Sequence, residues 1–278
     1  MDQIVAYFEN IPSLHRALIL VGGITFFWIL EGAVPLFSFR YKKWNHALPN
    51  LFFTLTTIII NFILAFILLT ASDWVVNNSF GLLYLFNNIP LALEVLIALL
   101  LLDFIGAFLA HYVEHKFNPL WMIHLVHHSD HNVDTTTANR HHPLESLIRF
   151  TFTLFAILIV GAPIGYVMLY QSISVLLTQF NHANIKLPKK IDKFLSYLIV
   201  SPDMHKIHHH YRLPYTDANY GNIFSIWDRM FGTYMYLDRE KIVYGVDVFP
   251  DQNKNSNIKD LLKQPFEKYQ RPTMSNEL

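Results

Sequence analysis

Three long apolar runs fill most of the first 110 residues, and they constrain the fold of this chain more than any other feature. They cover 16–38, 48–71 and 91–110; the second is free of charged residues, the first is interrupted by the acid Glu31, and the third contains Glu94 and Asp103. Each reaches the roughly 20 residues that cross a bilayer core at about 1.5 Å per residue. Since three such runs in succession are unusual for buried helices of a soluble protein, the sequence predicts an integral membrane protein.

A fourth apolar region, 147–180, is too long for one comfortable span and short for two complete ones. Its middle reads Gly-Ala-Pro-Ile-Gly at 161–165, a combination that breaks a helix and favours a turn. We therefore expect a short helical hairpin that enters the membrane and returns, with one long kinked helix as the alternative. The predicted fold class is all-α: a polytopic membrane helical bundle of three full spans plus a short helical hairpin, with a cytosolic histidine-rich cap.

The distribution of positive charge predicts the orientation. The loop after the first run contains Arg40, Lys42 and Lys43, whereas 72–90 contains no Lys or Arg. By the positive-inside rule the first loop is cytoplasmic, the N-terminus lies outside, and the third run delivers His111 to the cytoplasmic face.

We divide the chain into transmembrane helices (1–110), a histidine-rich catalytic region (111–250) that includes the membrane hairpin 147–180, and a flexible C-terminal tail (251–278). The formal net charge is zero and no basic patch dominates, so nucleic acid is not an expected partner. The absence of cysteine excludes disulfides and thiolate metal ligands.

Histidine is the compositional outlier, with 15 residues, and nine of them follow a pattern. An HxxxH pair is followed by HxxHH, a single histidine and a second HxxHH. On a helix, positions i, i+3 and i+4 share a face, so each HxxHH presents three imidazoles together. Nine imidazoles are more than one ion needs and suit two metal ions. The predicted metal ligands are His111, His115, His124, His127, His128, His182, His205, His208 and His209.

The types of ligand narrow the choice of metal. Carboxylate-bridged di-iron bundles use Glu-x-x-His motifs, which this sequence lacks, and structural zinc sites prefer thiolates. Imidazole ligands suit iron, zinc, copper or nickel. Attack on an unactivated C–H bond of a membrane-embedded substrate favours a redox-active metal, and therefore iron with O2.

The order of motifs resembles that of the fatty acid hydroxylase/sterol desaturase superfamily of membrane histidine-rich diiron oxygenases. The resemblance covers about 103–236 and includes HYVEH, HLVHHSDH, TTANRHHPLE, QFNHAN, SPDMHKIHHH and NYGNIFSIWDRMFGTY. Of these, QFNHAN and NYGNIFSIWDRMFGTY are more similar to the alkylglycerol monooxygenase-like branch than to the sterol oxidases. It implies two iron ions in a cytosolic cap and O2-dependent hydroxylation, desaturation or oxidation of a lipid such as a fatty acyl or sterol-like substrate. It also implies an external electron donor that is cytochrome b5-like, ferredoxin-like or a pterin.

The resemblance assigns ligand positions to all nine histidines. A further histidine of the fatty acid hydroxylase branch falls at Thr178 here, so a tenth ligand needs another source. The candidates, besides water, are His131, His142, His210 and Gln179.

Several other polar residues are candidates for supporting roles. Asp203 and Asp228 could accept a ring N–H from a ligand histidine, with a helix cap or a surface ion pair as the alternative for Asp203. Asp103, about two turns below His111, could support the metal ligands, because ionisable groups at membrane depth normally face the bundle interior. Arg140, His142 and Glu145 could bind a polar headgroup of the substrate or complete the metal site, or Arg140 and Glu145 could form a structural salt bridge.

Two other functions use part of the same pattern. HYVEH fits the HxxEH motif of a membrane zinc metalloprotease, with His111 and His115 as ligands and Glu114 as base, but seven clustered histidines would then lack a role. A non-catalytic metal transporter or sensor would place its ligands near the membrane midplane, whereas these histidines lie at the ends of apolar runs.

Overall fold

The computed structural model describes residues 1–38, 40–86 and 88–274, and every named element within them is a helix. Extended segments in this part of the chain meet only as isolated bridges, such as Ile199 with Phe224. The all-α fold class is confirmed.

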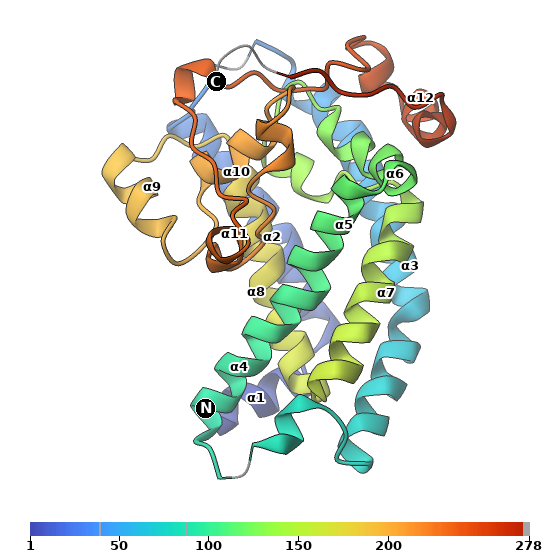
Figure 1. The fold of residues 1–278 in the computed structure, drawn as a ribbon, viewed down its shortest axis with the longest axis vertical. Coiled ribbons are helices and arrows are strands. Elements are labelled where there is room, and N and C mark those ends of the chain that lie inside the picture. Colours follow the sequence, from blue (N-terminus) through green and yellow to red (C-terminus); the bar gives the residue numbers. More distant parts are fainter. Residues whose placement is uncertain (39, 87, 275–278) are drawn as a thin grey trace.

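Long helices lying side by side form the body of the molecule (Figure 1). They are α2 (Ser13–Ala33), α3 (Lys43–Asn77), α4 (Leu91–Asp103), α7 (Pro143–Val160) and α8 (Ile164–His182). The α4 helix continues without a break through a π-helical turn, Phe104–Leu109, into α5 (Ala110–Lys116). Helix α3 packs on α7, and α2 packs on α8.

Four helices in the described part of the chain are long and apolar enough to cross a membrane: Ser13–Ala33, Lys43–Leu85, Leu91–Lys116 and Pro143–Val160. Apolar side chains on these helices point outward; Phe62 and Phe66 on α3 are both 72% exposed. A surface of this kind requires a lipid environment, because water would solvate it poorly. The chain is therefore an integral membrane protein.

The expected hairpin is present, and its turn lies where glycine and proline interrupt the apolar region. Gly161 ends α7 with a positive φ of 76°, and Pro163 precedes α8. A Cβ atom at Gly161 would lie 2.3 Å from the carbonyl oxygen of Phe80, so the turn also needs the small residue for packing. The first arm, α7, is itself one of the four candidate spans, so the hairpin is longer than expected.

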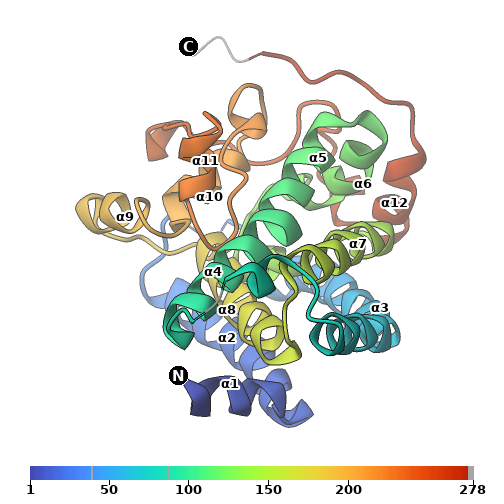
Figure 2. The ribbon, with the colours of Figure 1, turned by 60° about the horizontal axis from the view of Figure 1, so that its bottom comes forward.

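Short helices gather at one end of the bundle, shown at the top in Figure 1, and form the cap. They are α6 (Asn118–His128), α9 (Lys189–Leu195), α10 (Pro202–His208), α11 (Ile226–Met230) and α12 (Ile258–Lys263), with single turns η3 (Thr135–Asn139), η4 (Tyr215–Asp217), η5 (Arg239–Lys241), η6 (Lys254–Ser256) and η7 (Gln264–Phe266). At the other end, α1 (Asp2–Glu9) packs on α8, and η1 (Leu82–Leu85) lies between α3 and α4 (Figure 2).

Glu31, the acid within the first apolar run, joins α2 to the cap. Its carboxylate is fully buried and accepts the backbone N–H groups of Thr135 and Asn184 at 2.7 and 2.9 Å. The Lys43 ammonium lies 3.1 Å away. A buried carboxylate is tolerated only with such partners, so this charge fixes the end of α2 against the cap.

The segment 251–274 is not the loosely ordered tail that the sequence suggested. Leu261 on α12 is 1% exposed and packs with Phe53 and Val126, and Asn255 is also buried. The expectation failed because, among the described residues of this polar segment, Leu261 is the one buried apolar side chain, and the other buried residues, Asn255 and Gln264, are polar. The division of the chain at residues 110 and 250 stays a prediction.

Candidate metal centre

The structure brings all nine predicted histidines together as two adjacent clusters inside the cap. The five-histidine cluster contains His111, His115, His124, His128 and His208; the four-histidine cluster contains His127, His182, His205 and His209. Within each cluster the potential ligand atoms all lie within 4.8 Å of one another, and all nine side chains are buried.

Each HxxHH motif is divided between the two clusters. His124 and His128, at i and i+4, enter the five-histidine cluster, while His127 points into the other. The second motif is reversed: His205 and His209 enter the four-histidine cluster, and His208 joins the five. Since i+3 and i+4 lie on opposite sides of i around a helix, one motif serves two neighbouring sites.

The Nε2 atoms approach one another as ligands of a common ion would. His182 Nε2 lies 3.1 Å from His127 Nε2, 3.0 Å from His205 Nε2 and 3.2 Å from His209 Nε2. Metal–nitrogen bonds of about 2.1 Å give neighbouring ligands a separation of roughly 3.0 Å in an octahedron and 3.4 Å in a tetrahedron.

Hydrogen bonding alone does not satisfy these nitrogens. A neutral imidazole has one N–H, so His182 Nε2 cannot serve three neighbours at once. In the five-histidine cluster, the Nε2 atoms of His115, His128 and His208 are buried without a hydrogen-bond partner. Unpaired buried acceptors are costly, and a cation at the centre of each cluster would satisfy them. The residues present therefore fit two metal ions.

The second ring nitrogen of several histidines has a partner that fixes the ring. The contacting atom is Nδ1 in each case. Three histidines contact a backbone carbonyl: His111 that of Tyr220 (2.8 Å), His208 that of Ala218 (2.7 Å) and His182 that of Thr178 (2.8 Å). Two contact a carboxylate: His124 that of Glu145 (2.8 Å) and His115 that of Asp217 (3.2 Å). An acceptor at Nδ1 places the ring proton there and leaves Nε2 as a lone-pair donor.

Asp228 fixes the loop that carries two of these acceptors, the carbonyls of Tyr220 and Ala218. Its carboxylate accepts the backbone N–H groups of Tyr220 and Gly221 at 2.7 and 2.8 Å, which fixes the loop that carries the Tyr220 carbonyl. Asn219 ties the same loop to α10 by donating to the Met204 carbonyl at 2.9 Å. The sequence suggested that Asp228 contacts a histidine directly, and it did not single out Asn219, Tyr220 or Gly221.

Burial keeps the imidazoles neutral. It lowers the pKa of His124 to about 3, although Glu145 acts in the opposite direction. Burial, reinforced by neighbouring imidazoles, also holds the pKa values of His127, His128, His205, His208 and His209 well below their usual range. Neutral imidazole is the form that binds metals, so the cap maintains the ligand state at physiological pH.

A group of charged residues lies behind His124. Arg149 donates to Glu114 at 2.8 Å and to Glu145 at 2.9 Å. Glu145 also contacts His141 Nδ1 at 2.6 Å, and the His141 ring stacks on His127 with centroids 4.9 Å apart. Sequence reasoning missed His141 and weighed its neighbour His142. The i, i+4 spacing of His141 and Glu145 at a helix start was the available signal.

The four candidates for a tenth ligand all lie outside the clusters. His131 contacts the Asn255 side chain, and His142 caps α7 through the Leu144 N–H. His210 accepts the Val243 N–H, and Gln179 donates to the Leu20 carbonyl on α2.

The remaining acidic candidates hold the cap together without touching the clustered histidines. Asp103 accepts the N–H groups of Ile223 and Phe224 and the indole N–H of Trp227 at 3.0–3.2 Å. Asp203 pairs with Arg239, which matches the ion-pair alternative.

Arg140 is buried and has structural partners, contrary to the expected headgroup contact. Its Nε donates to the Val126 carbonyl, Nη1 to Asn50 and Nη2 to the Asn255 carbonyl, at 2.6–2.9 Å. Glu145 pairs with Arg149 instead of Arg140. Burial under the C-terminal segment removes the guanidinium from any ligand.

The family model described as "Fatty acid hydroxylase" matches residues 95–233, which is half of the chain and includes all nine histidines. The chain belongs to the fatty acid hydroxylase family. No solved structure matches it.

Curated relatives match about half of this fatty acid hydroxylase family member. Ornithine lipid hydroxylase OlsE of Rhizobium tropici is 26% identical over 145 residues, covering 52% of this chain and 43% of the relative. Alkylglycerol monooxygenase of Danio rerio is 33% identical over 150 residues, and that of Homo sapiens 28% over 151; each match covers 32% of the relative. The matches thus span less than half the length of these relatives.

Proposed function

We propose that this protein is an integral membrane diiron oxidoreductase that uses O2 to hydroxylate, desaturate or otherwise oxidise a lipid. The observation that carries the proposal is the pair of buried histidine clusters, with Nε2 atoms about 3 Å apart and no hydrogen-bonding scheme that satisfies them. Membership of the fatty acid hydroxylase family and relatives named as a lipid hydroxylase and a monooxygenase support the lipid and the oxidation.

In this proposal each cluster holds one iron ion, and the ligands are the nine histidines. Bound iron supplies the redox chemistry that activates O2 toward an unactivated C–H bond. The clusters adjoin: His127 of one and His124 of the other have ring centroids 5.2 Å apart, and His128 and His209 are 4.7 Å apart. Two ions so placed would act on the same substrate.

The chain's own residues have three tasks. The carbonyls of Tyr220 and Ala218 and the carboxylate of Glu145 fix the ring orientations. Burial of the nine imidazoles excludes water, and the neighbouring apolar helices let a lipid approach from the bilayer. Insertion of one oxygen atom from O2 releases the other as water, so an external electron donor is required; a cytochrome b5-like protein, a ferredoxin-like protein and a pterin are the candidates.

We also propose that the clusters face the cytoplasm. Arg40, Lys42 and Lys43 lie at the start of α3, at the same end of the bundle as the cap (Figure 1). The positive-inside rule assigns this end to the cytoplasmic side.

The two competing functions fit the geometry less well. A zinc protease would need Glu114 beside a metal-bound water, but Glu114 Oε2 pairs with Arg149 at 2.8 Å, and His111 and His115 share their site with three further histidines. A transporter would need ligands near the middle of its spans. Here His111 and His115 lie on α5, at the cap end of the Leu91–Lys116 helix.

Metal analysis and product analysis test the proposal together. Protein purified from iron-supplemented cells should contain two irons per chain, and cells expressing it under 18O2 should accumulate lipid products that carry 18O or an added double bond. Ornithine lipids and alkylglycerols are the first substrates to test. One zinc per chain with peptidase activity, or loosely held metal without any oxidised lipid, would refute the proposal.

His208→Ala should lower the rate of product formation by at least about 100-fold. Losing a residue that only supports a ligand typically lowers activity by about tenfold to 100-fold, and losing the ligand itself should have a larger effect. His209→Ala tests the other cluster in the same way. Membrane insertion should stay unchanged in both variants. The control is His15→Ala, an exposed histidine on α2 outside both clusters. Full activity in either cluster variant would show that the site is assigned wrongly.

A further inference from the structure

The cap carries an apolar surface away from the metal centre, formed by α9, the turn that follows it, and α11. We call it the α9–α11 surface; its exposed members are Ile191, Phe194, Tyr197, Leu198, Ile226, Met230 and Phe231. Phe194, Leu198 and Met230 are 65%, 62% and 65% exposed. Contiguous exposed aromatic and aliphatic side chains mark a surface that is covered in the working protein.

Helix α9 is amphipathic in the manner of helices that lie on a membrane. Asp192 is buried and accepts the Ser201 hydroxyl and the Asp203 N–H at 2.8 and 3.1 Å, which attaches one face of the helix to the cap. Ile191 and Phe194, three residues apart, point outward. Exposed lysines, at 189, 190 and 193, flank this face. Apolar residues bordered by lysines suit the boundary between acyl chains and anionic headgroups.

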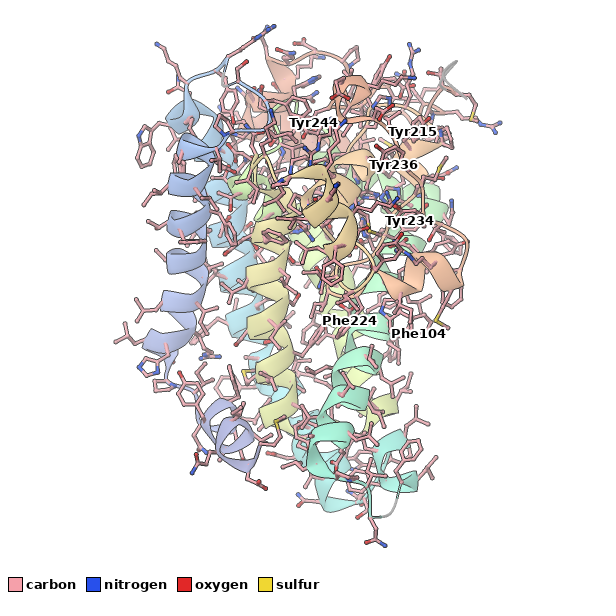
Figure 3. All side chains as sticks on the ribbon, turned by 90° about the vertical axis from the view of Figure 1, so that its left-hand side faces the viewer. Phe104, Tyr215, Phe224, Tyr234, Tyr236 and Tyr244 are labelled. Atoms are coloured by element: carbon pink, nitrogen blue, oxygen red, sulfur yellow. The ribbon has the colours of Figure 1, made fainter. Side chains whose placement is uncertain are left out.

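Helix α11 packs against the spanning helix Leu91–Lys116, at a level between the two ends of that helix. Trp227 and Phe231 pack on Phe104 with ring centroids 5.0 and 5.5 Å apart, and Phe231 also packs on Phe108 at 5.4 Å. Phe104 lies about 20 Å along the helix from Leu91, whereas the hydrocarbon core is about 30 Å thick. Figure 3 shows Phe104 and Phe224 at the same level, near the middle of the molecule.

The two helices form one continuous surface. Val200 N–H donates to the Ile223 carbonyl at 3.0 Å, and Ile199 and Phe224 form a bridge. The Arg229 guanidinium lies over the ring of Tyr197, 5.2 Å from its centroid. Because α11 is fixed beside the span, α9 is held near the same depth, and Figure 1 shows it projecting sideways from the bundle.

We propose that the α9–α11 surface is embedded in the leaflet that borders the cap, at the boundary of headgroups and acyl chains. The occupant is the lipid bilayer, because the surface continues the apolar side of the Leu91–Lys116 spanning helix at Phe104 and carries lysines at its edge. The embedded surface anchors two segments to the membrane. The first is the chain between His182 and the second HxxHH motif, and the second is the loop that follows this motif. This proposal does not depend on the metal content.

The absence of cysteine makes a direct test possible. Single-cysteine variants Phe194→Cys, Leu198→Cys and Met230→Cys of the full chain are labelled with a nitroxide in nanodiscs of phosphatidylcholine and phosphatidylglycerol. Collision rates with O2, which concentrates in lipid, and with a water-soluble nickel chelate are then compared. The references are Phe62→Cys on α3 and Phe266→Cys on the C-terminal segment, whose phenylalanines are equally exposed at 72% and 73%.

The O2-to-nickel ratio at the three test sites should be at least about tenfold above that at Phe266 and below that at Phe62, which lies in the middle of a spanning helix, as expected for residues inserted at the interface. A ratio like that at Phe266 would place the surface in water and overturn the proposal. Low collision rates with both reagents would mean that protein covers the surface, which would also overturn it. Three independent sites keep the test decisive if one variant misfolds.

Discussion

Single residues beside the clustered histidines decide which ring nitrogen faces the centre. Glu145 is the most connected of them, because its carboxylate contacts His124, His141 and Arg149 at 2.6–2.9 Å. Backbone carbonyls perform the same task for His111 and His208. A carbonyl cannot be removed by substitution, so the carboxylate is where this orienting effect can be measured.

Glu145→Ala should lower iron affinity by about tenfold to 100-fold, because His124 loses the acceptor that holds its ring. The measurement is iron retained per chain after dialysis against a graded chelator. Glu145→Gln has the same shape and keeps one acceptor oxygen but loses the charge, so it should recover only part of the loss, whereas a purely steric role would predict full recovery. Glu267→Ala, an exposed carboxylate, is the matched control. Unchanged retention in Glu145→Ala would contradict the orienting role.

Among the helices, the contact of α2 with α8 depends on one glycine. A Cβ atom at Gly23 would lie 2.0 Å from Gln179 Oε1 and 2.9 Å from Leu176 Cδ2. Gln179 is buried and already donates to the Leu20 carbonyl, so it cannot easily move away. The adjacent Gly22 has no atom within 4 Å of the same position.

Gly23→Ala should therefore destabilise the protein by about 1–3 kcal/mol through overpacking. Gly22→Ala should be neutral or stabilise by up to about 1 kcal/mol, because alanine is the better helix former. Thermal unfolding in detergent, followed by fluorescence, compares the two variants. Equal melting temperatures would mean that α2 and α8 do not pack as closely as described.

The π-helical turn Phe104–Leu109 is a second feature at this scale. It lies directly before His111 in the helix that supplies the HxxxH pair. A π-turn widens the helix and shifts the phase of the residues after it, and such turns are frequent at functional sites. Here it connects the aromatic contact with α11 to the start of the five-histidine cluster.

For the molecule as a whole, the C-terminal segment closes the cap over Arg140. Leu261 is buried against Phe53 on α3 and Val126 on α6, so this segment joins a spanning helix to the helix that carries three of the clustered histidines.

Leu261→Ala should cost about 2–4 kcal/mol of stability, as expected when a buried leucine leaves a cavity. Phe266→Ala, only five residues on, removes an exposed side chain and should change little. Chemical denaturation of the purified protein, monitored by circular dichroism, separates these outcomes. A similar small effect in both would show that the segment is not docked.

The low pKa values of the cap histidines predict acid sensitivity of the metal-free protein. Burial depresses the folded-state pKa of His124 to about 3, and those of His128 and His208 also lie well below normal. The unfolded chain, with histidine pKa values near about 6.5, binds more protons as the pH falls, at about 1.4 kcal/mol per pH unit for each imidazole. Stability is therefore fully present above about pH 6.5 and is lost progressively below it.

Melting temperatures of the metal-free protein at pH 7.5, 6.5 and 5.5 check this prediction, with the larger drop expected in the lower interval. Iron should be released over the same range, because protons compete for Nε2. Replacing cluster histidines by glutamine should flatten the dependence. A melting temperature independent of pH would contradict neutral, buried imidazoles.

The sequence by itself determined the helical membrane architecture and the nine clustered histidines. Apolar runs of about 20 residues have few alternatives to a spanning helix, and the HxxHH spacing fixes which rings share a helical face. The prediction was local in both cases, because each depends on residues within a few turns of one another.

Only the tertiary structure decided how the rings are divided into five and four, and what supports them. The partners of His111 and His208 are backbone carbonyls about 109 and 10 residues away, which no side-chain pattern reveals. Likewise, the spacing of His141 and Glu145 was visible in the sequence, but only the structure shows that His141 stacks on His127 whereas His142 caps a helix. Burial of Arg140 by Asn255 is again a contact between distant segments. These features depend on how separate helices meet in space, and helical periodicity carries no information about that.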